Sequence, residues 1–140
     1  MRMHMRRTLS LAAVVALGAC ALAPLQPDLN ARAPLLEGFG QSDFAFTASH
    51  PAARRHFTSG VLQAYAFNHA EAVRQFKAAL AFEPTCALCA WGVAWQLGPN
   101  INAPERGDLK QAQRYVQYAL RMAGPATARE RALIDAMAVR

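Results

Sequence analysis

The chain has 140 residues, which is enough for one small domain. Hydrophobic residues make up 54% of it and charged residues only 17%, a composition that excludes a disordered polar tail and favours helices packed closely through small side chains. The formal net charge is +6, and it falls to +3 from residue 20 onward, where 12 basic and 9 acidic residues remain. No run of basic residues with interleaved aromatic residues occurs, so we expect no nucleic-acid binding.

The first 19 residues have the pattern of an export signal. Residues 1–7 are basic and contain no acidic residue, and residues 9–19 are apolar apart from Ser10. This apolar stretch is shorter than the ~20 residues that a stable transmembrane helix needs. The sequence therefore predicts a signal peptide over residues 1–19.

Residues 17–20 read LGAC, which resembles the lipobox of bacterial lipoproteins. By this resemblance, Cys20 becomes a lipidated N-terminus that anchors the protein to a membrane of the cell envelope, facing the periplasm, because each buried acyl methylene contributes ~0.8 kcal/mol. Ala21 stands where lipoproteins of the inner membrane tend to carry aspartate, which favours the outer membrane. The alternative is an ordinary signal peptide cut after Ala21 or Ala23, which releases a soluble periplasmic protein.

Residues 20–48 are predicted to form a lipid-anchored, proline-rich tether. Proline fixes its own φ and lacks an N–H donor, so no helix is expected to run through this stretch. The interrupting residues are Pro24, Pro27, Pro34, Gly38 and Gly40. The aromatic residues expected to fold back on the first helix as an extended flap are Phe39, Phe44 and Phe46.

Apolar residues recur at helical spacing from residue 49 onward, and residues that start or end helices fall where the pattern changes. The first helix is expected to begin at Pro51, with Ser49 or His50 as its cap. The second is expected to follow Asn68, which has Glu71 at the spacing of a capping box.

A third helix is predicted over residues 85–97, ended by the glycine and proline that follow. Two more helix starts are predicted by the capping pairs Asp108 with Gln111 and Thr127 with Glu130. No stretch alternates with a period of two residues. Agreement between periodicity and caps therefore predicts an all-α fold over residues 49–140.

Five residues around the second helix match the spacing of a helical repeat: Gly60, Ala72, Phe76, Ala79 and Pro84, separated by 12, 4, 3 and 5 positions. This pattern resembles the tetratricopeptide repeat, in which paired helices of about 34 residues approach at small residues, an aromatic side chain fills the groove and proline ends the unit. A second unit repeats the separations 4, 3 and 5 with Ala112, Val116, Ala119 and Gly124. Its start lies 40 residues after that of the first, so the intervening loop holds about six extra residues.

Three runs are similar to a group of bacterial exported tetratricopeptide proteins: residues 65–72, 86–92 and 97–102. Members of that group are usually several times longer and have no assigned biochemical activity, so the resemblance implies a fold and little about chemistry. It implies the start of an α-solenoid, with about two and a half repeats after the signal and tether. We expect the chain to be the N-terminal portion of a longer array.

Cys86 and Cys89 form a C-x-x-C motif at the start of the third predicted helix, where the helix N-terminus favours a thiolate. The pair is compatible with a disulfide or inert packing, with a redox-sensitive pair, and with a metal site. Thioredoxin-like chemistry needs a βαβ context that is missing, and haem attachment needs a histidine after Cys89. The histidines match no metal-binding signature, so we expect neither a metal nor another cofactor.

Asn100 and Asn102 lie in a loop bounded by glycine and proline, where they can hold a turn by bonding the local backbone. They are the best candidates for a ligand-binding loop. His69 is expected to face solvent or pack on a loop, and His56 to line a groove. Five aromatic residues are expected mainly in the core, and any of them that face the concave surface are expected to anchor a peptide. They are Tyr65, Trp91, Trp95, Tyr115 and Tyr118.

The sequence contains no nucleophile elbow, phosphate loop or zinc-protease motif, so a non-enzymatic function is expected. The leading hypothesis is a membrane-tethered scaffold of the bacterial cell envelope that binds a protein or peptide partner in a helical groove. The alternative is a redox- or metal-responsive protein that uses Cys86 and Cys89.

Overall fold

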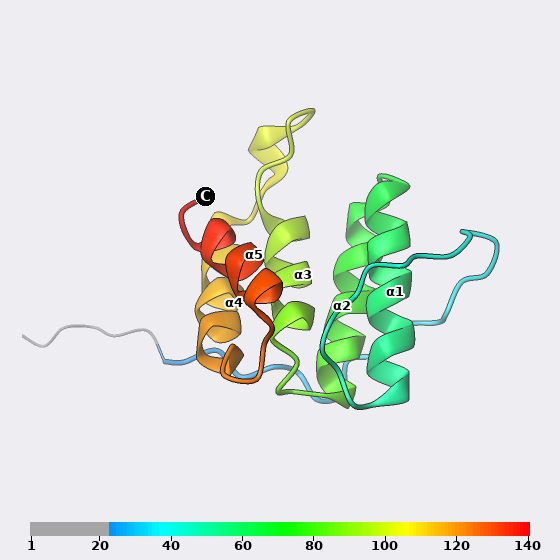
Figure 1. Ribbon diagram of the computed structural model, residues 1–140. Helices are drawn as coiled ribbons and strands as arrows, with labels where there is room; N and C mark the ends of the chain where they lie inside the picture. The colour runs from blue at the N-terminus through cyan, green and yellow to red at the C-terminus, as the bar shows by residue number, and fades with distance from the viewer. Residues whose placement is uncertain (1–22) are drawn as a thin grey trace, which may run out of the picture.

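The computed structural model describes residues 23–140, and this part of the chain contains five α-helices, one short 3-10 helix and no β-strand (Figure 1). The all-helical prediction is therefore confirmed for these residues. The predicted signal peptide and the predicted lipidation site Cys20 lie outside them. No helix in this part of the chain combines the length and the apolar content that crossing a lipid bilayer requires.

Consecutive helices pack against one another in chain order. The elements are α1 (Pro51–Tyr65), α2 (His69–Phe82), α3 (Ala87–Leu97), η1 (Pro104–Arg106), α4 (Leu109–Met122) and α5 (Ala128–Ala138). Helix α1 lies against α2, α2 against α3, and α3 against α4, while α5 rests on α3 and α4. Figure 1 shows α1 to α4 standing side by side, with the loop before α4 projecting beyond the end of α3.

Most of the predicted helix caps are present. Thr127 and Glu130 form a capping box at the start of α5. The Asp108 carboxylate caps α4. At the start of α1, the ring Nδ1 of His50 accepts a hydrogen bond from the Ala52 N–H at 3.1 Å. These caps pair backbone donors that a helix N-terminus otherwise leaves without a partner.

The predicted capping box between Asn68 and Glu71 is wrong. Asn68 is the N-cap residue of α2, but its side chain makes no bond to the helix and donates instead to Gln63 Oε1 at 2.9 Å. The Glu71 carboxylate accepts from Gln75 at 2.8 Å and pairs with Arg74 at 2.9 Å. Because Gln75 is fully buried and needs partners for its amide, it takes the carboxylate that the box would have used.

The ring of Phe76, in α2, lies between glycines of the two neighbouring helices. A Cβ atom on Gly60 of α1 would lie 2.7 Å from Phe76 Cε1, and one on Gly92 of α3 would lie 2.5 Å from Phe76 Cδ1. Both distances are below the ~3.5 Å at which carbon atoms pack, so a side chain at either position must displace the ring. The predicted close contact at Gly60 is present, and Gly92 supplies a second one that the repeat spacing did not identify.

The other residues at the predicted repeat positions lie inside the structure or at its turns. The buried ones are Ala72, Ala79, Ala112, Val116 and Ala119. Pro84 follows α2, and its carbonyl accepts a hydrogen bond from the Tyr118 hydroxyl at 3.0 Å. This bond fastens the connection between α2 and α3 to α4.

Residues 23–48, which we call the belt, pass around the helices on two sides. The first part crosses α4 and α2, where Leu25 is buried and the Pro34 carbonyl accepts from Gln75 Nε2 at 2.6 Å. An exposed loop follows, and the belt then returns across α1 (Figure 1). The segment predicted to be a tether is therefore in contact with the helices near both of its ends.

The belt contains the aromatic flap that the sequence predicts, although only two of its three members pack. Phe44 and Phe46 lie against Phe57 of α1, with ring centroids 5.7 and 3.8 Å away. Phe39 is 42% exposed in the loop between the two halves of the belt.

Adding one methyl group at either glycine beside Phe76 should destabilise the fold. We expect Gly60→Ala and Gly92→Ala each to lower the free energy of unfolding by about 1–3 kcal/mol through overpacking, although alanine is otherwise the better helix former. Urea denaturation followed by circular dichroism measures this change. Gly124→Ala is the matched control, because no atom lies within 4 Å of its added Cβ, and it should stay within about 0.5 kcal/mol of the wild type.

A double-mutant cycle separates ring contact from helix propensity. Phe76→Leu combined with Gly60→Ala should lose less stability than the sum of the two single changes, because the smaller side chain leaves room for the new methyl group. Additive losses would contradict the proposed role of the ring.

Candidate functional site

One side of the helical stack carries four aromatic side chains, which we call the aromatic row: Phe57 and Tyr65 of α1, and Trp91 and Trp95 of α3. The ring centroids of Trp91 and Trp95 are 5.3 Å apart, and those of Trp95 and Tyr65 are 6.0 Å apart. Trp91 is buried and donates its indole N–H to the Leu133 carbonyl of α5 at 3.1 Å, whereas Tyr65 is 69% exposed. The row therefore leads from the core to the solvent.

The belt covers the buried half of the aromatic row. Phe44 lies between the two helices, with its ring centroid 5.7 Å from that of Phe57 and 6.1 Å from that of Trp91. Phe46 stacks on Phe57 at 3.8 Å. Phe44 and Phe46 are two positions apart, and both rings contact Phe57, so both point to the same side of the belt.

Polar contacts to α5 fix the main chain of the same belt segment. The carboxylate of Glu130 accepts hydrogen bonds from the Thr47 N–H and, at 2.8 Å, from the Thr47 hydroxyl. Arg129 donates to the Ala45 carbonyl at 3.0 Å, and its guanidinium lies 4.7 Å from the centre of the Phe44 ring. Aromatic packing and bonds to its main chain thus hold this segment against the helices, and side chains of α5 are the partners of the main-chain groups.

Two carboxylates, Glu130 beside the second half of the belt and Glu83 beside the start of α1, are kept ionised by their hydrogen bonds. Burial raises the pKa of the Glu130 carboxyl, but the bonds from Thr127 and Thr47 lower it by more, so its pKa lies below the usual 4.5. Burial likewise raises the pKa of Glu83, and the N–H groups of His50 and Ser49 lower it below 4.5. Both groups therefore favour the folded state in their charged form.

The exposed half of the aromatic row opens into a pocket of about 340 Å³. Tyr65 and Trp95 line it together with Phe67 and Ile101 from the adjoining turn and loop. Phe67 is 72% exposed and Ile101 is 95% exposed. Clustered apolar side chains that remain in contact with water are typical of a binding surface.

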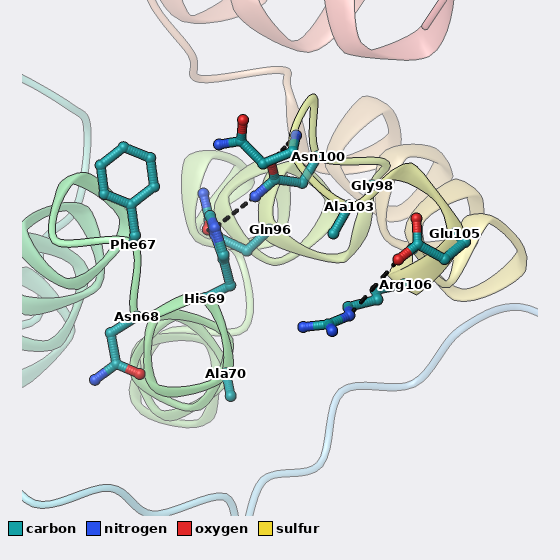
Figure 2. Close-up of a pocket in the computed structure, with 12 residues that line it drawn as sticks. Phe67, Asn68, His69, Ala70, Gln96, Gly98, Asn100, Ala103, Glu105 and Arg106 are labelled. Carbon is teal, nitrogen blue, oxygen red and sulfur yellow. Dashed lines mark hydrogen bonds and ion pairs between the residues drawn. The ribbon is translucent and has the colours of Figure 1, made fainter.

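A larger pocket of about 690 Å³ adjoins it, between the start of α2, the end of α3 and the loop that follows. His69 is at its centre, and Figure 2 shows the side chains of Gln96 and Asn100 converging on the imidazole. His69 Nδ1 lies 2.7 Å from Gln96 Oε1, and Nε2 lies 2.6 Å from Asn100 Nδ2. A ring with its hydrogen on Nδ1 satisfies both bonds, because it donates to the first amide and accepts from the second.

Phe67 forms one edge of this pocket and has an unusual backbone conformation. Its φ is +59°, in the left-handed region that costs a residue with a side chain about 1–2 kcal/mol. The turn between α1 and α2 needs this conformation, because the Asn68 N–H bonds back to the Gln63 carbonyl at 2.9 Å. An exposed aromatic residue in a position suited to glycine costs stability, which indicates a role at the pocket.

Both asparagines predicted to form a binding loop line the larger pocket. Asn100 Oδ1 also accepts from the Asn102 N–H at 2.8 Å, which holds the turn as expected. His69 packs on this loop, in agreement with the prediction for it. His56 does not line a groove: it is buried, bonded to Gln75 at 2.8 Å and stacked on Phe82, so that prediction is wrong.

Gln96 and Phe67 are pocket residues that the sequence patterns did not identify. For Gln96 a signal exists, because it is the one polar side chain in the otherwise apolar helix α3. Phe67 gives no such signal, since an aromatic residue between two helices is equally compatible with core packing.

Cys86 and Cys89 are joined by a disulfide at the start of α3. Cys86 is the N-cap residue, and its sulfur accepts from the Cys89 N–H at 3.1 Å. Both residues are buried, at 2% and 0% exposure, where a cysteine sulfur is shielded from reaction partners. This placement favours the structural interpretation of the pair over the redox one.

Within residues 23–140, no three His, Cys, Asp or Glu side chains come close enough together to hold a metal ion. The charged groups of the larger pocket are Glu105 and Arg106, which form an exposed ion pair at 3.7 Å. Amides, one imidazole and apolar walls supply hydrogen bonds and contact area, which suits the pocket to binding. Comparison with family models, with curated proteins and with solved structures gave no match.

Replacing Phe67 by glycine should stabilise the protein. The variant Phe67→Gly should gain about 1 kcal/mol in free energy of unfolding, because glycine adopts positive φ without strain and the lost side chain is mostly exposed. Thermal and urea denaturation measure the gain. Phe39→Gly is the matched control, because Phe39 is also exposed but has no positive φ to relieve, and it should give no gain. Equal effects at the two sites would refute the strain at Phe67.

The stability provided by Glu130 should depend on pH. Its folded pKa is depressed, so its contribution is present above about pH 4.5 and is lost as pH falls through the folded pKa. We expect Glu130→Gln to lower the free energy of unfolding by about 1–3 kcal/mol at pH 7, with the gap to wild type shrinking on acidification. Glu105→Gln, at an exposed site, is the control. A gap that stays constant down to pH 2 would contradict the assignment.

Proposed function

We propose that this chain is a non-enzymatic scaffold of the tetratricopeptide type that binds a protein or peptide partner. The repeat spacing and the close contacts of Phe76 with Gly60 and Gly92 support the repeat architecture, because small residues belong where helices of such a repeat meet. In this proposal α1, α3 and α5 are the helices that face the partner.

The observation that carries the proposal is the bound belt segment. The aromatic row and α5 already hold a non-helical stretch of chain by its backbone and by two aromatic side chains. The surface therefore has the chemistry that an extended peptide requires: apolar sites at alternate residues, and fixed partners for main-chain N–H and C=O groups.

The free end of the row provides room for a partner. Tyr65, Phe67 and Ile101 are all more than two-thirds exposed, and Trp95 lies beside them. Aromatic side chains dominate the energetics of protein interfaces, particularly where polar groups surround them. His69 and Asn100 provide such a polar border on the side of the larger pocket.

We further propose that the protein works in the bacterial cell envelope. The basic and apolar N-terminal segment supports export, and the resemblance of residues 17–20 to a lipobox supports a lipid anchor on Cys20, facing the periplasm and with the outer membrane favoured. Without lipidation, the protein would be soluble in the periplasm. The redox alternative has less support, since both sulfur atoms of the Cys86–Cys89 pair are buried.

Affinity capture from envelope extract tests the proposal. The double variant Phe67→Ser with Ile101→Ser should recover at least tenfold less of the partner than the wild type, because it removes exposed apolar anchors. The matched control is Leu29→Ser with Leu36→Ser, which changes two exposed belt leucines that line neither pocket. The control should capture as much as the wild type. If the wild type captures no more than the Phe67→Ser with Ile101→Ser variant, the proposed function is wrong.

A further inference from the structure

The belt segment Asp43–Thr47 contacts the aromatic row in the manner of a ligand. Phe44 and Phe46 supply the side-chain contacts, and the residues between and after them supply main-chain groups: the Ala45 carbonyl to Arg129 and the Thr47 N–H to Glu130. The side chain of Ala45 takes no part in these bonds. A foreign peptide with any small residue at that position could form the same contacts.

Two glycines lie in the loop on one side of this segment, and a separate fastening lies on the other side. Gly38 and Gly40, at φ +85° and +86°, lie in the exposed loop, and no atom comes within 4 Å of the position of either missing Cβ. On the other side, the N–H groups of Ser49 and His50 are bonded to Glu83 at 2.8–3.0 Å. The start of α1 is thus fixed independently of the five residues before Ala48.

The belt does not cover the whole of the aromatic row. Beyond Phe44 and Trp91 it reaches Trp95 and Tyr65, whose pocket is lined by no belt residue. Figure 1 shows the belt turning away over α1 before that point. A peptide that occupied both halves would make every contact that the belt makes and would add those at Trp95 and Tyr65.

We infer that residues 43–47 are a displaceable internal ligand of the aromatic row, and that its external partner is an extended peptide with two aromatic residues separated by one small residue and followed by serine or threonine. This inference rests on the proposed function. The belt competes at the millimolar effective concentration that a short tether gives, so it excludes weak ligands. The partner overcomes this competition through apolar residues that precede its aromatic pair and reach Trp95 and Tyr65.

The experiment measures whether the chain binds its own belt segment when that segment is supplied as a separate peptide. The probe is a fluorescein-labelled peptide of residues 41–49, titrated with the full chain and followed by fluorescence polarisation. The variant Phe44→Ala with Phe46→Ala removes the two belt rings that cover the row, and it should bind the peptide at least tenfold more tightly than the wild type. A peptide with both phenylalanines replaced by alanine is the control and should not bind.

Several outcomes overturn the inference. A double variant that keeps its helical circular dichroism but does not bind the probe shows that the row is not an exchangeable site. Equal binding of the alanine peptide shows that the aromatic pair is not recognised. If the double variant unfolds, the variant Thr47→Val is used instead, since it removes only the hydroxyl bond to Glu130. Tighter binding of the probe than by the wild type supports exchange. Binding of the probe at the wild-type level overturns the inference.

The results separate this inference from the proposed function. Probe binding without any captured envelope partner would support the inference that residues 43–47 are an internal ligand, and it would reject the scaffold function. Capture that depends on Phe67 and Ile101, together with no probe binding, would show that partners use the open pocket and that the belt is a fixed part of the fold.

Discussion

The contact of one ring with two glycines sets the geometry on which the remaining structure depends. Because Gly60 and Gly92 lack side chains, α1 and α3 both approach the Phe76 ring on α2. This approach brings Phe57 and Trp91 close enough for Phe44 to contact both. A wider separation of α1 and α3 would leave Phe44 in contact with only one of these two rings, and the site for the belt segment would be lost.

Features determined by near neighbours in the sequence were predictable. The Thr127–Glu130 capping box forms because its members are one helical turn apart and nothing else competes for them. The same pattern at Asn68 failed because Gln75, buried by contacts from distant segments, takes the Glu71 carboxylate. Periodicity identifies a cap candidate, but tertiary packing determines whether another group competes for the capping side chain, and the local pattern carries no information on that packing.

The candidate site was predictable only in part. The loop of Asn100 and Asn102 was identified because short polar side chains in a loop bounded by glycine and proline can hold a turn by bonding the local backbone. The polar contacts of the belt to α5 were not, since Thr47 and Glu130 are 83 positions apart and no local rule relates them. For Phe67, the unusual feature is a backbone angle, and aromatic residues give no indication of positive φ.

The span between Thr47 and Glu130 has a consequence for biosynthesis. A ribosome makes about 5–20 residues per second, so several seconds pass between the synthesis of Thr47 and that of its α5 partner. During that interval Phe44 and Phe46 can pack on α1 and α3, but the bonds from Glu130 and Arg129 do not yet exist. The nascent chain therefore passes through a stage in which the segment with Phe44 and Phe46 lacks the contacts that α5 later provides.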